Sequence, residues 1–277
     1  MTREKVSASC ILCGSTNRSV LYTRNEWKVY KCEGCGLGVL DPRPGPGQLN
    51  NLYNQAYFDN HYNQELPPDS DAMLRRLEQE SHRLRFFRPY KKTGRILDIG
   101  CGRGYFLLAC RRSNYEVEGV DVSPDAAAYV KTTLNIPVQA GPISNIALDE
   151  AAYDVVTMWH SLEHTPDPNE HIKMAGRWLK DDGILVVDVP NHEGYDARKA
   201  WSQWTQWDLP FHLYHFTPRS LTALLEKHGF EIIRRKNYLS EQMKAKLQKA
   251  AIPGALARII AQFYSGGSYA VVARKRI

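Results

Sequence analysis

Four cysteines near the N-terminus have the spacing of a metal site. Cys10 and Cys13 form one C-x-x-C pair and Cys32 and Cys35 form another, with 18 residues between the pairs. Four thiolates at this spacing can surround one Zn²⁺ ion tetrahedrally. The residues between the pairs alternate like a β-hairpin, and a ribbon this short has almost no apolar core of its own. We therefore expect a structural zinc ion that leaves no coordination position for catalysis.

A second group of chemically active residues lies in the stretch WHSLEHTPDP, where His160, Glu163 and His164 fall within five positions. The pattern H-x-x-E-H also occurs in zinc peptidases, which need both histidines on one helical face. Here the pattern directly follows an apolar strand expected over 154–158, and the next helix is expected only from about Pro168. We therefore reject the peptidase interpretation. Three interpretations remain: His164 as a general base, a metal-binding set, or side chains that shape the loop.

A third group combines tryptophans with polar rings further along the chain. It consists of Trp201, Trp204, Trp207, His212, Tyr214 and His215. An aromatic wall with polar rings suits a substrate pocket, in which tryptophans could stack on sugars or planar rings. The same rings could instead form a small aromatic core. A well-marked helix follows, with Thr217 as its cap, Pro218 at its first position and Gly229 at its end.

The segment GRILDIGCGRGYFLLACRR indicates the scaffold that positions these groups. An apolar strand over 96–99 runs into Gly100, Gly102 and Gly104 and then into a helix. A glycine-rich turn between a strand and a helix lets a ligand approach the backbone closely. Its spacing, G-x-G-x-G, differs from the G-x-G-x-x-G of dinucleotide enzymes. The next strand ends in Asp121, where a carboxylate can accept both hydroxyls of a ribose.

On these residues the chain resembles class I S-adenosylmethionine (SAM)-dependent methyltransferases. The resemblance covers roughly residues 70–235 and rests on the pair LDIGCGRG and GVDVS. It implies an α/β fold with a Rossmann-like, doubly wound sheet of seven strands. It also implies SAM as the cofactor and an enzyme that transfers a methyl group to an acceptor by in-line attack.

The resemblance implies a role for individual residues around the cofactor. Gly100 and Gly102 would leave room for the methionine part of SAM, Asp98 would help to hold its amino group, and Asp121 would bind the ribose diol. The adenine contacts follow the pattern least closely, because an acid that family members often carry there is missing. The expected SAM contacts, with Pro142 and Ile143 beside adenine, are Asp98, Gly100, Cys101, Gly102, Gly104, Asp121, Val122, Pro142, Ile143 and Trp159.

The histidine segments are similar to two kinds of methyltransferase. Ubiquinone-pathway O-methyltransferases carry a similar LEH preceded by a further glutamate, where this chain has His160, so metal binding stays open. Enzymes that add carbon methyls to nucleotide-linked deoxysugars also begin with a four-cysteine zinc module, and their histidines and tyrosine act on the sugar. The expected catalytic residues are His160, Glu163, His164, His212, Tyr214 and His215. The expected substrate contacts are Tyr57, Trp201, Trp204 and Trp207.

Charge is distributed unevenly along the chain, whose net charge is +6. Residues 1–47 carry 7 basic and 4 acidic side chains, residues 48–233 carry 19 and 25, and residues 234–277 carry 10 and 1. The acidic central segment favours a small-molecule acceptor, either a sugar, a glycan or a natural product, over nucleic acid. An RNA methyltransferase and a non-catalytic SAM-binding protein are the alternatives.

The basic tail continues into an apolar stretch that is broken by Pro253 and Gly254. It could form a helical hairpin packed on the domain, or it could lie on an anionic membrane surface, in which case the acceptor could be lipid-linked. No apolar run reaches the roughly 18 residues that a membrane span requires, and the N-terminus carries no apolar signal segment. We therefore expect a cytoplasmic protein.

The length of 277 residues, 43% of them hydrophobic, is enough for one core and a small second module. We expect a zinc ribbon over residues 1–47 and a helical lid or linker over 48–92. The SAM-binding domain is expected over 93–277, with an aromatic substrate insertion near 192–216.

Overall fold

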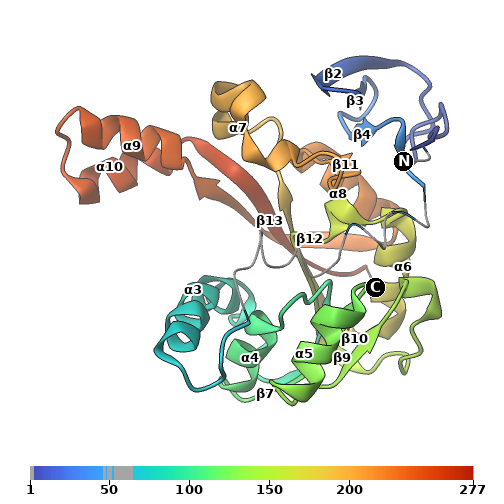
Figure 1. Ribbon diagram of the computed structural model, residues 1–277, viewed down its shortest axis with the longest axis vertical. Helices are drawn as coiled ribbons and strands as arrows, with labels where there is room; N and C mark the ends of the chain where they lie inside the picture. The colour runs from blue at the N-terminus through green and yellow to red at the C-terminus, as the bar shows by residue number, and fades with distance from the viewer. Residues whose placement is uncertain (1–2, 46–47, 49–51, 53–64, 277) are drawn as a thin grey trace.

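A central sheet of seven strands organises the molecule (Figure 1). The computed structural model describes residues 3–45, 48, 52 and 65–276, and Tyr57, a predicted substrate contact, lies outside them. The sheet order is β12-β13-β10-β9-β6-β7-β8. The strands are β6 (Gly94–Ile99), β7 (Tyr115–Asp121), β8 (Val138–Ala140), β9 (Tyr153–Trp159), β10 (Leu179–Pro190), β12 (Phe230–Leu239) and β13 (Ser265–Lys275). β13 runs opposite to the other six strands of this sheet, and the seven-stranded Rossmann-like fold is confirmed.

Alternate residues of the central strands face opposite sides of the sheet. Leu97 and Val156 belong to one apolar cluster, whereas their neighbours Ile96 and Val155 belong to another. Strands buried on both faces need such continuous apolar sequence, and helices must cover each face. Both faces of this sheet are therefore buried, as a doubly wound arrangement requires.

Eight helices are described, and five of them begin at a side-chain cap. The helices are α3 (Asp71–Phe87), α4 (Tyr105–Arg111), α5 (Pro124–Thr132), α6 (Pro168–Trp178), α7 (Tyr195–Ala200), α8 (Pro218–Lys227), α9 (Glu241–Lys249) and α10 (Gly254–Ala261). The side chains of Ser123 and Thr217 accept backbone N–H groups at the starts of α5 and α8, and Ser220 completes a capping box with Thr217. The predicted cap of α8 is thus present, and it fixes the helix that follows the aromatic segment.

The N-terminal residues form a small sheet that is shared with a distant part of the chain. Its order is β11-β4-β3-β2. The strands are β2 (Arg18–Arg24), β3 (Trp27–Cys32), β4 (Gly38–Leu40) and β11 (Tyr214–His215), and a separate pair joins β1 (Arg3–Glu4) to β5 (Arg43–Pro44). Because β11 belongs to the aromatic insertion, the cysteine module and that insertion are hydrogen-bonded into one unit.

The basic tail forms a helical hairpin that lies away from the body of the molecule. Helices α9 and α10 extend from one end of the long β12–β13 ribbon (Figure 1). Ile259 and Phe263 are 55% and 84% exposed, which is unusual for large apolar side chains. Within the described part of the chain, no helix combines the length and apolar character that crossing a membrane requires.

Candidate active site

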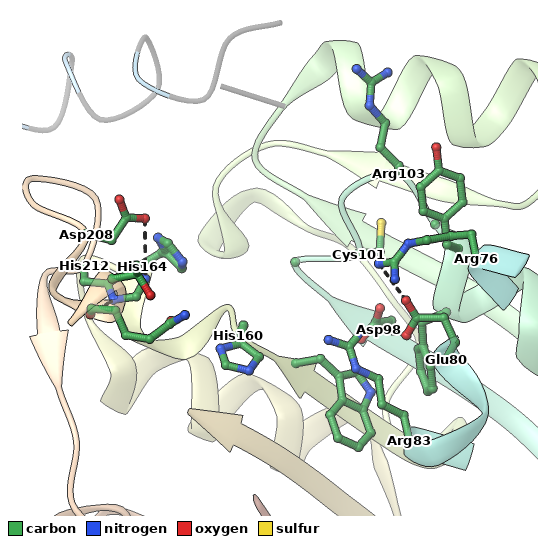
Figure 2. A pocket seen from close by; sticks show the side chains of 17 residues that line it. Arg76, Glu80, Arg83, Asp98, Cys101, Arg103, His160, His164, Asp208 and His212 are labelled. Atoms are coloured by element: carbon green, nitrogen blue, oxygen red, sulfur yellow. Dashed lines mark hydrogen bonds and ion pairs between the residues drawn. The ribbon is translucent and has the colours of Figure 1, made fainter. Parts of the chain in front are cut away.

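A cavity of about 510 Å³ lies beyond the carboxyl ends of β6 and β9. Open α/β sheets bind their ligands at this edge. Figure 2 shows two groups of side chains facing each other across the cavity, with His160 between them. We call them the Asp98 end and the histidine end. The Asp98 end consists of Arg76, Glu80, Arg83, Asp98, Gly100, Cys101 and Trp159, and the histidine end of His164, Thr205, Gln206, Asp208 and His212.

The Asp98 end is built where β6 stops. Asp98 is buried and accepts a 2.6 Å hydrogen bond from the Thr157 hydroxyl on the neighbouring strand β9. Burial raises the pKa of its carboxyl to about 7. Gly100 has φ +78°, and a Cβ there would clash with the side chain of Ser161. The turn therefore requires glycine, and it leaves the Asp98 carboxylate facing a ligand-sized space.

Three charged residues of α3 complete the Asp98 end. Arg76 and Arg83 both pair with Glu80, at 2.7 and 2.8 Å, and Glu80 is 2% exposed. Two guanidinium groups share one carboxylate, so one positive charge is uncompensated within this cluster. The sequence interpretation missed these residues, although their spacing of four and three positions places them on one helical face.

Asp121 braces the glycine turn from the adjacent strand end. Its carboxylate accepts backbone N–H groups from Gly102 at 2.7 Å and Ser123 at 2.9 Å. Burial raises the pKa of Asp121, although these hydrogen bonds oppose the rise. Among the predicted SAM contacts in the described chain, five do not line the cavity: Gly102, Asp121, Val122, Pro142 and Ile143. Their contact with a cofactor stays a prediction.

His160 stands between the two ends in a strained conformation. Its φ is +52°, a backbone region that residues other than glycine rarely adopt. Its Nδ1 is 3.4 Å from Glu163 Oε1, and its Nε2 is 3.9 Å from Asp188 Oδ2. Burial lowers the pKa of this imidazole, but the two carboxylates outweigh burial and raise it overall. With 30% of its side chain exposed, His160 is the predicted catalytic histidine that lies nearest the middle of the cavity.

The histidine end joins two segments that are far apart in sequence. The backbone N–H of Leu213 donates to the carbonyl of Glu163 at 2.8 Å, which fixes the insertion against the 3₁₀ turn of Leu162–His164. The rings of His164 and His212 then meet edge to face, with centroids 4.5 Å apart. Burial, followed by the nearby His212, lowers the pKa of His164 to about 3. An imidazole held neutral in this way is a poor proton acceptor and a good ligand.

The other predicted site residues lie behind the histidine end. Tyr214 donates to the Pro166 carbonyl at 3.2 Å, and His215 is buried with neither ring nitrogen hydrogen-bonded to a described residue. Trp207 is fully buried and stacks on Tyr22 at 4.3 Å, while Trp201 is 45% exposed. Among described residues, none of these side chains, and not Trp204 either, lines the cavity. Trp204 and Trp207 are buried and pack against each other, and a role of the three tryptophans in substrate binding stays a prediction.

The four N-terminal thiols converge at one point. Cys10 and Cys35 have their sulfur atoms 3.5 Å apart, and Cys13 and Cys32 have the same separation. Sulfur atoms about 2.3 Å from a tetrahedral zinc ion would lie roughly 3.8 Å apart, so the cluster fits such an ion closely. The thiols are therefore suited to hold one metal ion.

A family model described as "Methyltransferase domain" matches residues 71–235. The chain belongs to this methyltransferase family. It is a family of enzymes, and curated proteins that resemble the chain are named as S-adenosylmethionine-dependent methyltransferases. The predicted resemblance is confirmed over nearly the same residues.

Two curated relatives illustrate what this methyltransferase is similar to. A Mycolicibacterium smegmatis protein named "Probable S-adenosylmethionine-dependent methyltransferase/" is 29% identical over 139 residues, which cover 50% of this chain and 52% of that protein. A Bordetella avium "Ubiquinone biosynthesis O-methyltransferase" is 30% identical over 103 residues, covering 35% and 43%. The chain thus spans about half the length or less of these relatives.

Solved structures share the fold at lower identity. A SAM-dependent methyltransferase from Archaeoglobus fulgidus is 23% identical, with a TM-score of 0.57 over 80% of this chain and 100% of that one. Another from Mesorhizobium loti is 16% identical, with a TM-score of 0.51 over 72% and 100%. This similarity supports the architecture and not a particular acceptor.

Proposed function

We propose that the cavity binds SAM at its Asp98 end and a hydroxylated small molecule at its histidine end. The proposal depends on one observation, that a single cavity joins the glycine turn of the family to a cluster of polar side chains. A sugar, a glycan or a natural product would suit this polar lining, because Thr205, Gln206 and Asp208 offer hydroxyl, amide and carboxylate partners.

The residues of the Asp98 end fit the groups of SAM. The Asp98 carboxylate would bind the ammonium group of the methionine part, and Arg76 and Arg83 would bind its carboxylate. The Gly100 turn provides the close backbone approach, and Asp121 would accept the ribose hydroxyls with the lone pairs that Gly102 and Ser123 leave. When bound, SAM supplies an electrophilic methyl group that an acceptor oxygen or carbon attacks in line.

The chain would accelerate this transfer mainly by alignment. Holding two reactants in the reactive geometry can supply effective molarities on the order of 10⁵–10⁸ M. An acceptor hydroxyl would also lose a proton. His160 would receive it more readily than His164, because the pKa of His160 is raised whereas burial lowers that of His164. A general base would contribute typically 10²–10⁴-fold, and the assignment of that role to His164 stays a prediction.

The test is to identify a methylated product. Labelled SAM is incubated with the full chain and a fractionated small-molecule extract, and labelled products are identified by mass spectrometry. We expect a labelled hydroxylated compound with the wild type and none with Asp98→Ala. A protein that binds SAM but labels no fraction would contradict the proposed acceptor class, and salt-dependent labelling of RNA would favour the alternative.

We also propose that zinc occupies the four-cysteine cluster and has a structural role. The near-equal sulfur separations support it, as does the use of all four positions by thiols. Purified protein should contain about one equivalent of zinc per chain by elemental analysis. Less than about half an equivalent of zinc or iron would contradict the proposal.

The hairpin α9–α10 is proposed as a peripheral contact for anionic membranes. The exposed Ile259 on α10 and Phe263 two residues after its end lie near Lys246, Lys249 and Arg258 in the chain, a combination typical of interfacial segments. Vesicles that contain an anionic lipid should carry the wild type in a flotation assay, whereas neutral vesicles should carry much less. If Phe263→Ser floats as well as the wild type does, or if neither floats, the membrane contact is wrong.

A further inference from the structure

Glu163 is a carboxylate in an unusual environment. Its side chain is fully buried, and neither carboxylate oxygen has a hydrogen-bond partner among the described residues. Among the described residues, its ionic neighbour is His160, whose Nδ1 lies 3.4 Å from Glu163 Oε1. A buried carboxylate needs hydrogen bonds, a paired cation or a metal ion to offset the loss of water. Among the described residues, no cation lies at an ordinary hydrogen-bonding distance from Glu163, and a bound metal ion would offset the burial of its carboxylate.

Two imidazoles surround the same point. Ligand atoms of Glu163, His164 and His212 all lie within 4.8 Å of one another. Ligands at about 2.0–2.2 Å from one ion would be roughly 3–4 Å apart, so small side-chain shifts would bring the three together. Such a set, two histidines and one carboxylate, is common to zinc, iron and manganese sites.

Neighbouring groups hold the ring of His212 in the orientation that a metal ligand requires. Its Nδ1 bonds to the Gln206 carbonyl at 2.8 Å, which assigns the ring proton to that nitrogen. Its Nε2 lies 3.8 Å from Asp208 Oδ2. Metal-bound histidines usually donate their second N–H to a carbonyl in this manner. His164 also has a hydrogen bond to the backbone of Phe211.

We propose that Glu163, His164 and His212 bind one divalent transition-metal cation, with Asp208 as a nearby fourth donor. His164 and His212 line the cavity, whereas Glu163 does not, so Glu163 would hold the ion from behind and its open positions would face the acceptor. That orientation rests on the proposed function, since it assumes an acceptor at the histidine end. In this arrangement His164 is a ligand rather than the base, and an acceptor hydroxyl bound to the cation would lose its proton more readily, with His160 as the cavity histidine that receives it.

Manganese is the probe that separates this site from the thiol cluster. Mn²⁺ prefers nitrogen and oxygen ligands to thiolates, and its EPR signal counts free ions directly. The zinc-loaded full chain should bind about one Mn²⁺, and Glu163→Gln and His212→Ala should each weaken that binding at least about tenfold. His228→Ala is the matched control, because this histidine pairs with Asn169 outside the cavity and should leave affinity unchanged.

Two further measurements keep the proposal testable if a variant folds poorly. In the metal-free state Glu163→Gln should melt at the same temperature as the wild type or higher, because a neutral amide replaces a buried charge, and Mn²⁺ should raise the melting temperature of the wild type alone. Pulsed EPR of the wild type with Mn²⁺ should show modulation from imidazole nitrogen. The absence of that modulation, no binding at millimolar Mn²⁺, or unchanged affinity in both ligand variants would overturn the proposal.

SAM binding is measured separately by calorimetry on the same samples. Mn²⁺ binding without SAM binding would leave the cation site standing and remove the proposed function. SAM binding without Mn²⁺ binding would do the reverse.

Discussion

The two ends of the cavity are built in different ways. The Asp98 end comes from the residues where one strand ends, the turn after it and one helix, and Asp98 and Glu80 both have hydrogen-bond or ion-pair partners from nearby elements. The histidine end brings together His164 and His212, which are 48 positions apart and are held by the Leu213–Glu163 backbone bond. Among the described residues, the N-terminal sheet pairs with the segment that carries the histidine end, through β11. Cofactor binding should therefore tolerate damage that abolishes acceptor binding.

Loss of the zinc cluster should produce the largest difference between its effect on methyl transfer and its effect on SAM affinity. Cys32→Ser removes one ligand, and the ribbon depends on metal because it has little apolar core of its own. The β4–β11 pairing should loosen and displace His212, and a shift of about 1 Å can lower turnover by about 100-fold. We expect at least that loss in methyl transfer, with SAM affinity within a few-fold of the wild type by calorimetry. Cys110→Ala, at a buried thiol on α4, is the control and should keep its zinc.

Removal of His164 should have the next largest effect. His164→Ala should lower turnover by about 10²–10⁴-fold, whether the imidazole acts as a base or as a ligand. SAM affinity should be unchanged, because the ring lies at the opposite end of the cavity from Asp98. His171→Ala on α6 is the matched control. Unchanged turnover of His164→Ala would reduce this histidine to a part of the scaffold.

Substitution of Asp121, which braces the glycine turn, should instead weaken the binding of SAM. Asp121→Ala removes the acceptor of the Gly102 and Ser123 N–H groups and the predicted partner of the ribose. A hydrogen bond to a charged group contributes about 1.5–3 kcal/mol, so SAM affinity should fall by about 10–100-fold. Asp125→Ala, at an exposed position on α5, should bind SAM normally. If both variants bind SAM equally well, Asp121 does not contribute to the cofactor site.

Substitution of the exposed Trp201 should have the smallest effect of these changes. Trp201→Ala should change the free energy of unfolding by about 1 kcal/mol or less, because the side chain is 45% exposed. The buried Trp207→Ala should cost about 3–5 kcal/mol in a denaturant titration. A raised KM for the acceptor in Trp201→Ala, at unchanged stability, would support the predicted substrate contact, and an unchanged KM would remove it.

The sequence predicted the strand and the glycine turn of the Asp98 end because their signals are local, but it did not predict Arg76, Glu80 and Arg83 of α3. The apolar strand, the Gly100 turn and the carboxylate at Asp121 lie close together in the chain, and each residue type follows from a backbone requirement. The helix after Thr217 was predicted for the same reason, since its cap and Pro218 are neighbours.

The histidine end could be predicted only in part. His164 and His212 were recognised as reactive residues, but their contact depends on the Leu213–Glu163 bond, which no spacing rule predicts. Asp208 was missed for the same reason. Tyr214 was expected in the pocket, yet its strand pairs with β4, because a sheet edge can recruit any extended segment that packing brings to it.

A crystal structure with S-adenosylhomocysteine tests the central claim most directly, that one cavity joins a cofactor end to an acceptor end. We predict that the amino group of the ligand meets Asp98 and that its sulfur points past His160 toward His164 and His212. A ligand bound elsewhere, or one whose sulfur faces away from these histidines, would contradict the account.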